Sequence, residues 1–292
     1  MNISPLTAGT MTWGHWGADY APADMARLIA HCIERGVTTF DHADIYGHYT
    51  TEETFGVALE QLGTAARADV QLVTKCGIGL VTKNRPENRV KHYDSSRAHI
   101  LASVDRSLEN LRTDYIDLLL IHRPDFLMRP EEVAAAFEIL LTTGKVKHFG
   151  VSNFSPSQFE LLNSYVPLET NQIEFHPLHV DPLFDGTLDQ LVAKKTQPMI
   201  WSPLGGQKYF AGESTSVLRL RDEVKHVAEK HGGVTESVIL LAWLLRHPSR
   251  PLPVLGTTKA GRIDESLRAL SIELDRQDWY AILEAGRGHE VA

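Results

Sequence analysis

The sequence predicts an α/β protein folded as a (β/α)8 TIM barrel, a closed ring of eight parallel strands with helices outside. Eight short apolar segments that suit strands alternate with segments whose apolar residues recur at helical spacing. Several strand segments end in a polar side chain, as strands do where their carboxyl ends line the mouth of a barrel. Barrels of this class commonly reach 292 residues undivided, so we expect one domain, residues 1–292.

The first half of the chain supplies four of the expected strands. They are Leu6–Met11, Val37–Asp41, Val70–Lys75 and Ile116–His122. Between them, apolar residues fall three or four positions apart, as on one face of a helix. These stripes are Met25, Leu28, Ile29, Cys32 and Ile33; Phe55, Ala58, Leu59 and Leu62; and Ile100, Val104, Leu108 and Leu111. Thr50 and Glu53 have the spacing of a capping box, and 77–94 is expected to be a long loop.

The second half continues the alternation. The expected strands are Phe149–Ser152, Thr170–Glu174, Pro198–Ser202 and Leu252–Gly256. The helical stripes are Val133, Phe137, Leu140 and Leu141; Leu188, Leu191 and Val192; and Trp279, Ile282 and Leu283 after Asp275. Two further helical stretches precede the last strand. Ser155, Pro156 and Gln158 suit the N-cap, N1 and N3 positions of a helix, so we expect a capping box there.

A doubly wound sheet is the alternative for such an alternation. The phosphate-binding fingerprint G-x-G-x-x-G follows none of the early strands, which favours the barrel.

Composition excludes several classes of partner. The net charge is −8 and no basic run occurs, so we expect neither a nucleic-acid nor a membrane-surface partner. No apolar run approaches the roughly 18 residues of a membrane span. The first residues lack the features of a signal peptide, which favours a cytoplasmic location. Cys32 and Cys76 are the only cysteines, so a disulfide framework is not indicated, and the sequence carries no signal for oligomeric state.

Four polar side chains near strand ends have complementary chemistry: Asp41, Tyr46, Lys75 and His122. An isolated tyrosine, with a pKa of about 10, is a poor acid–base catalyst at neutral pH. A lysine ammonium beside it favours the phenolate and should bring that pKa toward the working range, while Asp41 holds the lysine charged. His122 can donate a hydrogen bond to a substrate oxygen. The set suits protonation of a carbonyl oxygen, and since none of the four delivers a hydride, a nicotinamide cofactor is implied.

Seven motifs in order resemble the successive signatures of the aldo-keto reductases. They are Asp41-His42-Ala43-Asp44-Ile45-Tyr46-Gly47, Thr74-Lys75, Asp117–His122, Gly150–Phe154, Asn171–Glu174, Trp201–Leu204 and Gly256–Lys259. The resemblance spans nearly the whole chain. It implies a barrel that binds NADP(H) without a Rossmann fold and reduces a small carbonyl substrate, or oxidises the corresponding alcohol.

The resemblance also implies roles by position. Tyr46 matches the general acid, Lys75 and Asp41 the pair that tunes its pKa, and His122 the group that orients the carbonyl. Ser152, Asn153 and Gln172 match the residues that bind the nicotinamide carboxamide, and Trp201 matches an aromatic that stacks on the ring. Ser202, Leu204 and Gly205 match the loop over the pyrophosphate. Thr257, Thr258, Lys259, Arg262, Glu265 and Ser266 match the adenosine and 2′-phosphate segment, with Arg262 at an expected helix start.

The sequence also departs from the family pattern. His42 stands where a small residue commonly follows the strand-end aspartate, and Ser266 stands where many members carry asparagine. Trp13, Trp16 and Arg123 lie on loops expected to ring the pocket and are candidates for substrate contact.

Three other interpretations compete with the leading one. In the first, Asp41 and Lys75 form an ion pair that is only structural. Fourteen histidines raise a metal barrel as the second, but no H-E-x-x-H motif occurs and a lysine would repel a cation, so no metal is expected. In the third, the chain is a nicotinamide-binding regulatory or interaction protein that turns over slowly, as the potassium-channel β-subunits of the same family permit.

Overall fold

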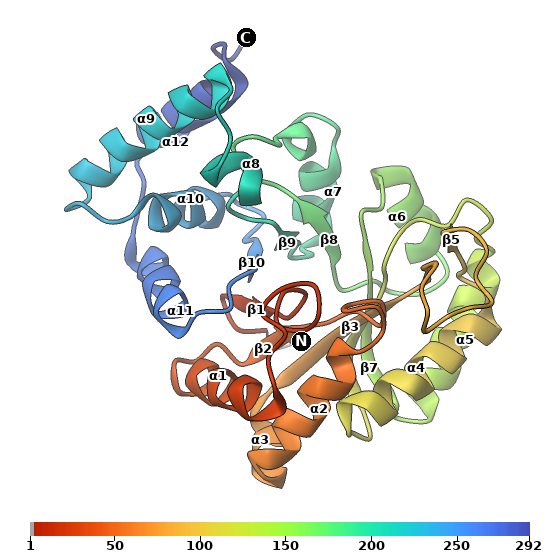
Figure 1. Ribbon diagram of the computed structural model, residues 1–292. Helices are drawn as coiled ribbons and strands as arrows, with labels where there is room; N and C mark the ends of the chain where they lie inside the picture. Colours follow the sequence, from red (N-terminus) through yellow and green to blue (C-terminus); the bar gives the residue numbers. More distant parts are fainter. Residues whose placement is uncertain (1–2) are drawn as a thin grey trace. The chain divides into compact units, whose positions relative to one another are not determined.

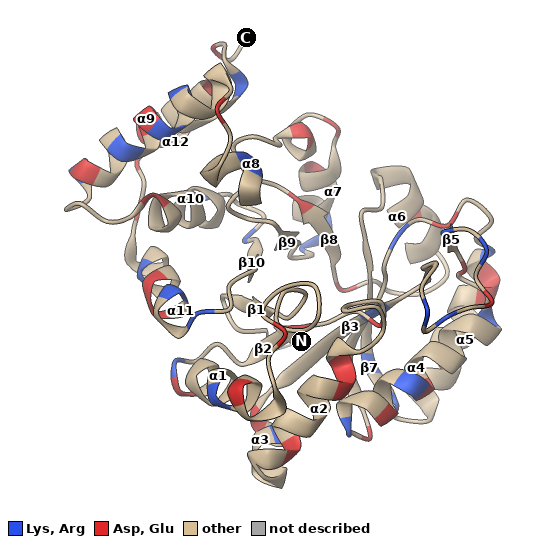
Figure 2. Ribbon diagram, viewed as in Figure 1, with Lys and Arg blue, Asp and Glu red and all other residues tan. Residues whose placement is uncertain are grey.

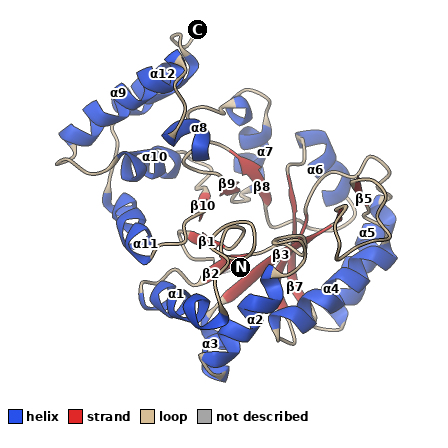
Figure 3. Cartoon of the chain, viewed as in Figure 1, coloured by secondary structure: helices blue, strands red, loops and turns tan. Residues whose placement is uncertain are grey.

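The computed structural model describes residues 3–292, and Figures 1 and 3 show its helices and strands. The strands follow the order of a closed parallel barrel, β1-β10-β9-β8-β7-β6-β3-β2. The predicted fold class is confirmed. The barrel strands are β1 Thr7–Gly9, β2 Thr39–Asp41, β3 Gln71–Cys76, β6 Ile116–Ile121, β7 Val146–Ser152, β8 Asn171–Glu174, β9 Met199–Trp201 and β10 Leu252–Leu255. The chain divides into two compact units, one reaching to Gln172 and including Gly256–Ala260, the other comprising Ile173–Leu255 and Gly261–Ala292.

The first unit carries the parallel run from β1 to the start of β8. Asp41 pairs with Gly9 on one side and Val73 on the other, and Ser152 pairs with Gln172. Its helices are α1 Pro22–Glu34, α2 Thr51–Gln61, α3 Thr64–Asp69, α4 Arg97–Leu111, α5 Pro130–Thr142 and α6 Pro156–Asn163. Successive helices pack on one another outside the strands (Figure 1). Because these strands run the same way, their carboxyl ends open on one edge of the unit.

The second unit contains the β9–β10 pair, in which Leu252 lies opposite Met199. Its helices are α7 Thr187–Lys194, α8 Gly206–Phe210, α9 Thr215–Lys230, α10 Glu236–Leu245, α11 Ala260–Leu267 and α12 Arg276–Arg287, with short 3-10 turns at Asp181–Leu183 and Arg268–Ser271. Trp243 of α10 and Trp279 of α12 stack at 4.9 Å between ring centroids, and each indole N–H donates to the other's backbone carbonyl. This double tie joins the two helices in the core of the unit.

Of the predicted helix caps and buried helix positions, some agree with the structure and others do not. The Ser155 capping box forms as predicted. The Thr50 box does not, because the Thr50 hydroxyl donates to the carbonyl of Gly47 at 2.7 Å and so leaves the helix end uncapped. Leu141 and Val192 were placed on buried stripes but are 56% and 41% exposed.

Among the elements that the sequence did not predict are two short strands and one short helix. The expected loop 77–94 contains a small antiparallel pair, β4 Ile78–Gly79 with β5 His92–Tyr93. Helix α3 buries only Ala66, so it has no apolar stripe from which a sequence could predict it.

Charges are spread over the helices rather than gathered. Figure 2 shows both signs mixed along α9 and α11. Cys32 and Cys76 are buried as thiols rather than joined in a disulfide. Among residues 3–292, no helix is long and apolar enough to cross a membrane.

Candidate active site

The four predicted catalytic side chains meet at the strand ends of the first unit. Asp41 ends β2, Lys75 is the penultimate residue of β3, His122 directly follows β6, and Tyr46 lies in the turn after β2. All four are buried, and Lys75 is 0% exposed. Strands β2, β3 and β6 are consecutive neighbours in the sheet, so sequence-distant residues converge.

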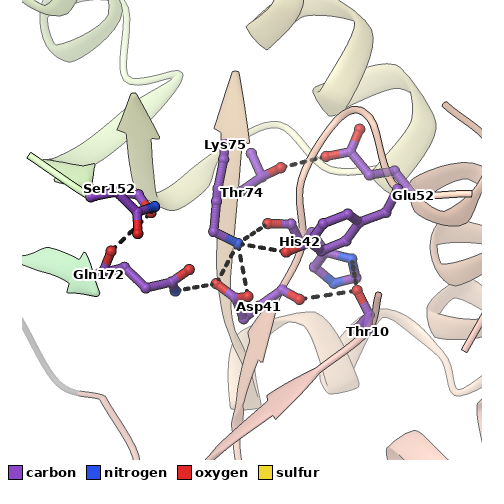
Figure 4. Close-up of polar contacts among 10 residues, drawn as sticks. Thr10, Asp41, His42, Glu52, Thr74, Lys75, Ser152 and Gln172 are labelled. Carbon is purple, nitrogen blue, oxygen red and sulfur yellow. Dashed lines mark hydrogen bonds and ion pairs between the residues drawn. The ribbon is translucent and has the colours of Figure 1, made fainter. Parts of the chain in front are cut away.

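The Lys75 ammonium is the centre of the cluster. Its Nζ atom lies 2.8 Å from both carboxylate oxygens of Asp41, 2.6 Å from the backbone oxygen of His42 and 3.2 Å from the hydroxyl of Tyr46. Figure 4 shows Lys75 pointing between Asp41 and His42, while the preceding Thr74 points the opposite way. Three N–H groups thus meet three acceptor groups, which satisfies a buried cation.

Burial and neighbouring charge set the protonation states. Burial alone would lower the pKa of Lys75, but Asp41 and Tyr46 raise it above its ordinary value, so the ammonium stays charged. Burial raises the pKa of Tyr46, and this outweighs the lowering by Lys75. The expectation that Lys75 brings this pKa down toward neutrality was therefore wrong in net direction. The phenol therefore keeps its proton at neutral pH.

His122 is neutral. Burial, followed by the charges of Lys75, Arg123 and Lys91, lowers its pKa well below the ordinary value. Its Nδ1 atom is buried and has no hydrogen-bond partner among residues 3–292, which leaves Nε2 as the nitrogen able to meet a ligand. The rings of His122 and Tyr46 lie 6.1 Å apart, edge to face. The two side chains can therefore both serve a single oxygen atom.

The three residues matched to the nicotinamide carboxamide lie together beside this cluster. Ser152 donates to the carbonyl of Gln172 at 2.9 Å, and the Asn153 amide donates to the Ser152 hydroxyl at 2.7 Å. Asn153 has a φ of 60°, a left-handed conformation that asparagine tolerates better than most residues. Gln172 donates to Oδ1 of Asp41 at 2.8 Å (Figure 4). Amide and hydroxyl groups can donate and accept, so their chemistry fits a carboxamide.

The segment Gly256–Lys259 is tied to the loop after β1 within the same unit. The indole of Trp13 donates to the carbonyl of Thr257 at 2.9 Å, and the Tyr20 hydroxyl donates to that of Thr258 at 2.6 Å. Lys259 is exposed. These bonds fix the backbone of the segment matched to the adenosine end.

The three candidate substrate residues differ in access. Trp13 is 0% exposed and packs on Phe40 and Phe55, so we assign it to the core rather than to a substrate contact. Trp16 is half-buried, with its ring centroid 6.0 Å from that of Tyr46. Arg123 is half-buried directly after His122. Trp16 and Arg123 keep surface at the mouth of the cluster.

The remaining candidate cofactor residues belong to the second unit. Trp201 ends β9, Ser202 and Gly205 have positive φ angles in the turn that follows, and Leu204 is half-buried between them. Helix α11 begins at Ala260, two residues before its expected start, so Arg262 lies inside the first turn. Arg262 is exposed, Glu265 is half-buried, and the buried Ser266 donates its hydroxyl to the Arg262 carbonyl.

Two buried groups beside the site were not predicted. His42, noted only as a departure, packs behind Asp41 with its ring nitrogen 2.9 Å from the hydroxyl of Thr10. Glu52 of α2 accepts hydrogen bonds from Thr74 at 2.5 Å and from Ser107 at 3.0 Å. Glu52 lies three residues before Phe55 and seven before Leu59, on the apolar stripe of α2, so helical spacing could have predicted that its side chain faces inward. Within 3–292, no cluster of three or more His, Cys, Asp or Glu side chains is arranged to hold a metal ion.

Comparison with known proteins agrees with this geometry. The model of the Aldo/keto reductase family matches residues 5–287. The chain is 45% identical to "Uncharacterized oxidoreductase YcsN" of Bacillus subtilis, covering 100% of this chain and 97% of the relative. It is 41% identical to a "6-dehydroglucose reductase" of Agrobacterium fabrum, covering 98% and 97%.

A solved structure is also similar. The thermostable aldo-keto reductase Tm1743, crystallised with the inhibitor epalrestat, aligns with a TM-score of 0.79 and 28% identity, covering 97% of this chain and 95% of that one. The chain belongs to the aldo/keto reductase family of oxidoreductases, whose members typically use a nicotinamide cofactor.

Proposed function

From this family membership and the contacts of Lys75, we propose that the protein is an NADPH-dependent carbonyl reductase. A bound nicotinamide would supply a hydride to a small aldehyde or ketone, and Tyr46 would supply the proton. The observation that carries the proposal is the Lys75 ammonium held by Asp41 at 2.8 Å and in contact with the Tyr46 hydroxyl at 3.2 Å. One family match spans 5–287, which supports the whole chain acting as a single domain.

Each side chain has a distinct role in the proposal. Tyr46 donates the proton to the carbonyl oxygen as that oxygen gains negative charge. Lys75 stabilises the phenolate that remains, and Asp41 offsets the cost of burying the ammonium. Neutral His122 orients the same oxygen through an N–H donor on Nε2. A bound nicotinamide would supply the hydride, which no side chain of the site can deliver.

The amide cluster supports the cofactor assignment. Ser152, Asn153 and Gln172 would hold the carboxamide, and Gln172 would connect it to Asp41 through the 2.8 Å bond already present. By position in the family, the other cofactor residues are Trp201, Ser202, Leu204, Gly205, Thr257, Thr258, Lys259, Arg262, Glu265 and Ser266.

Preference for NADPH over NADH is assigned to Lys259 and Arg262. Charge-assisted bonds to a phosphate contribute about 1.5–3 kcal/mol each, enough for roughly tenfold to a hundredfold discrimination. Fluorescence titration of both cofactors against wild type and the Lys259→Ala/Arg262→Ala variant checks this. Only NADPH binding should weaken, and equal losses for both cofactors would reject the assignment.

The substrate is proposed to be a small carbonyl compound contacted by Trp16 and Arg123. A relative that is 41% identical is named a 6-dehydroglucose reductase, which makes a sugar aldehyde the first compound to test.

NADPH oxidation across a panel of aldehydes, including 6-dehydroglucose, tests the proposal. Tyr46→Phe should slow turnover about 10²–10⁴-fold, the usual contribution of a positioned proton donor, with little change in NADPH affinity. Tyr165→Phe removes a hydroxyl from an exposed tyrosine of the same unit and is the matched control. A Tyr46→Phe enzyme with near wild-type kcat would reject the assignment. Cofactor binding without turnover on any carbonyl would favour the regulatory alternative.

A further inference from the structure

The side chain of His42 is locked in place behind the catalytic pair. Its ring is 0% exposed and lies edge-on to Phe55 of α2, with 4.2 Å between ring centroids. Burial, helped by the charge of Lys75, lowers the pKa of His42 to about 3, so the ring is neutral. It therefore takes no part in proton transfer. Its role must come from what it holds.

Thr10 connects the His42 ring to the backbone of Asp41. The Thr10 hydroxyl lies 3.0 Å from the carbonyl of Asp41 and 2.9 Å from Nδ1 of His42. A carbonyl only accepts, so the single hydroxyl proton goes to Asp41, and the hydroxyl must accept from a protonated Nδ1. The Thr10 backbone N–H donates to the same carbonyl at 3.0 Å. Residues 41 and 42 are thus held from both the backbone and the ring.

The carbonyl of His42 is in turn a ligand of the catalytic lysine. Its 2.6 Å distance to Nζ of Lys75 is shorter than the 2.8 Å distances to Asp41 and the 3.2 Å distance to Tyr46. Asp41 and His42 are adjacent, so displacement of this backbone would move two of the three acceptor groups that hold the ammonium. Figure 4 shows Thr10, His42, Asp41 and Lys75 in this one chain of contacts.

We propose that Thr10 and His42 are positioning residues that hold the backbone of residues 41–42, and through it the Lys75 ammonium, at the distance from Tyr46 that proton transfer needs. This inference rests on the proposed function of Tyr46 and Lys75. It explains why a histidine follows the strand-end aspartate: a small residue at this position has no ring to reach Thr10 and pack on Phe55.

Four side chains act on Tyr46. Lys75 contacts its hydroxyl, Asp41 raises its pKa, Arg123 lowers its pKa, and His122 faces its ring. A substitution at Thr10 leaves all four side chains in the protein. Any change in the titration of Tyr46 would then report a change in position.

Isosteric substitutions test the proposal. Thr10→Val removes the hydroxyl at nearly constant shape, and His42→Leu removes the ring donor. Loss of one such bond costs about 0.5–1.5 kcal/mol, so kcat should fall roughly twofold to tenfold. The basic limb of the pH–rate profile should move to higher pH, because a less well-placed ammonium stabilises the phenolate less. Thr10→Ser and His42→Asn, which keep a hydroxyl and a donor near Nδ1, should restore both values.

Thr39→Val is the matched control. Thr39 is buried at the start of β2. Its hydroxyl donates to Gln71 at 3.2 Å and accepts from the backbone N–H of Ser4 at 2.9 Å, so it contacts no group of the site. A second measurement is independent of turnover: absorbance titration of Tyr46, taken as the difference between each protein and its Tyr46→Phe derivative. The pKa of Tyr46 should rise in Thr10→Val and stay unchanged in Thr39→Val.

The proposal would be overturned if Thr10→Val changes neither the pKa of Tyr46 nor the basic limb of the pH–rate profile. It would also be overturned if Thr39→Val raises the pKa of Tyr46 by the same amount. If Thr10→Val does not fold, His42→Leu and His42→Asn are compared instead, and absence of the shift from every folded variant overturns it. The two proposals can fail separately. If the wild-type protein reduces no carbonyl, the proposed function is refuted; if the pKa of Tyr46 still rises in Thr10→Val, the positioning role stands.

Discussion

Two buried carboxylate clusters lie on either side of β3 in the first unit, and they neutralise their charge in opposite ways. Asp41 faces Lys75 and forms an ion pair at 2.8 Å. Glu52 faces Thr74, the neighbouring residue on the strand, and receives hydrogen bonds from two hydroxyls, those of Thr74 and Ser107. Burial raises the pKa of Glu52 despite these bonds. One cluster keeps its charges by pairing them, while the other shifts toward protonation.

Asp44 raises the free-energy cost of burying the second cluster. Its Oδ1 atom is buried without a partner in the described part of the chain, although part of the residue remains accessible. Burial and then the charge of Glu52 raise the pKa of Asp44 well above its ordinary value. The difference teaches that burial alone does not decide the state of an acid. A cation on the same face of the strand does, and alternation of side chains along β3 places Lys75 on only one face.

Removal of the Lys75 cation would leave both clusters without a paired charge, and it should have the largest effect on stability. Lys75→Met leaves Asp41 buried and unpaired, which should lower the free energy of unfolding by about 3–5 kcal/mol. Any remaining turnover should show the basic limb of its pH–rate profile at higher pH, because no ammonium stabilises the Tyr46 phenolate. Urea unfolding and pH–rate profiles measure the two effects.

Lys147→Met is the control for this variant, because Lys147 also pairs with a carboxylate, Asp117 at 3.2 Å, but is half-exposed. It should change stability by less than about 1 kcal/mol. Equal losses in the two variants would mean that burial adds nothing to the Asp41–Lys75 pair.

Neutralisation of Asp44 tests the second cluster directly, and it should have the next largest effect on stability. An acid whose folded-state pKa is raised binds more protons in the folded than in the unfolded state, so wild type loses stability as pH rises above about 4. Asp44→Asn removes this loss, at about 1.4 kcal/mol per unit of pKa shift. The stability of the variant relative to wild type should therefore grow with pH. The control is Asp105→Asn, which removes an exposed acid of α4 that pairs with Lys145. Equal growth in the two variants would mean that burial of Asp44 is not the cause.

Glu52→Gln should have the smallest effect, because Thr74 and Ser107 already offset part of the burial cost. The direction is the same: the variant gains stability relative to wild type as pH rises above about 4.5. The Gln oxygen can keep the Thr74 bond, and the Ser107 hydroxyl can rotate to accept from the amide. Denaturant unfolding of Glu52→Gln beside Glu53→Gln, its exposed neighbour, checks this. A relative loss of stability with rising pH would show that Glu52 is held ionised.

The fold and the clustering of the candidate catalytic side chains were predictable because periodic signals carry them. Alternation of strand and helix patterns predicted the barrel, and the strand-end positions of Asp41, Lys75 and His122 predicted their convergence. Signals of a single residue pair were less reliable. Ser155 capped its helix, while Thr50 found a nearer acceptor in Gly47, a choice that depends on the backbone angles of the turn.

What the sequence determined by itself was the set of residue types at the strand ends, and hence the phenol, the ammonium and the carboxylate of the candidate site. Only the tertiary structure decided their energies. Burial outweighs Lys75 in setting the pKa of Tyr46, and Trp13 belongs to the core rather than to the pocket. The tie from Thr10 through His42 to Lys75 joins β1, β2 and β3 across long stretches of chain. Periodicity reports which side of its own element a residue faces, whereas desolvation and hydrogen bonding depend on which other elements cover that side.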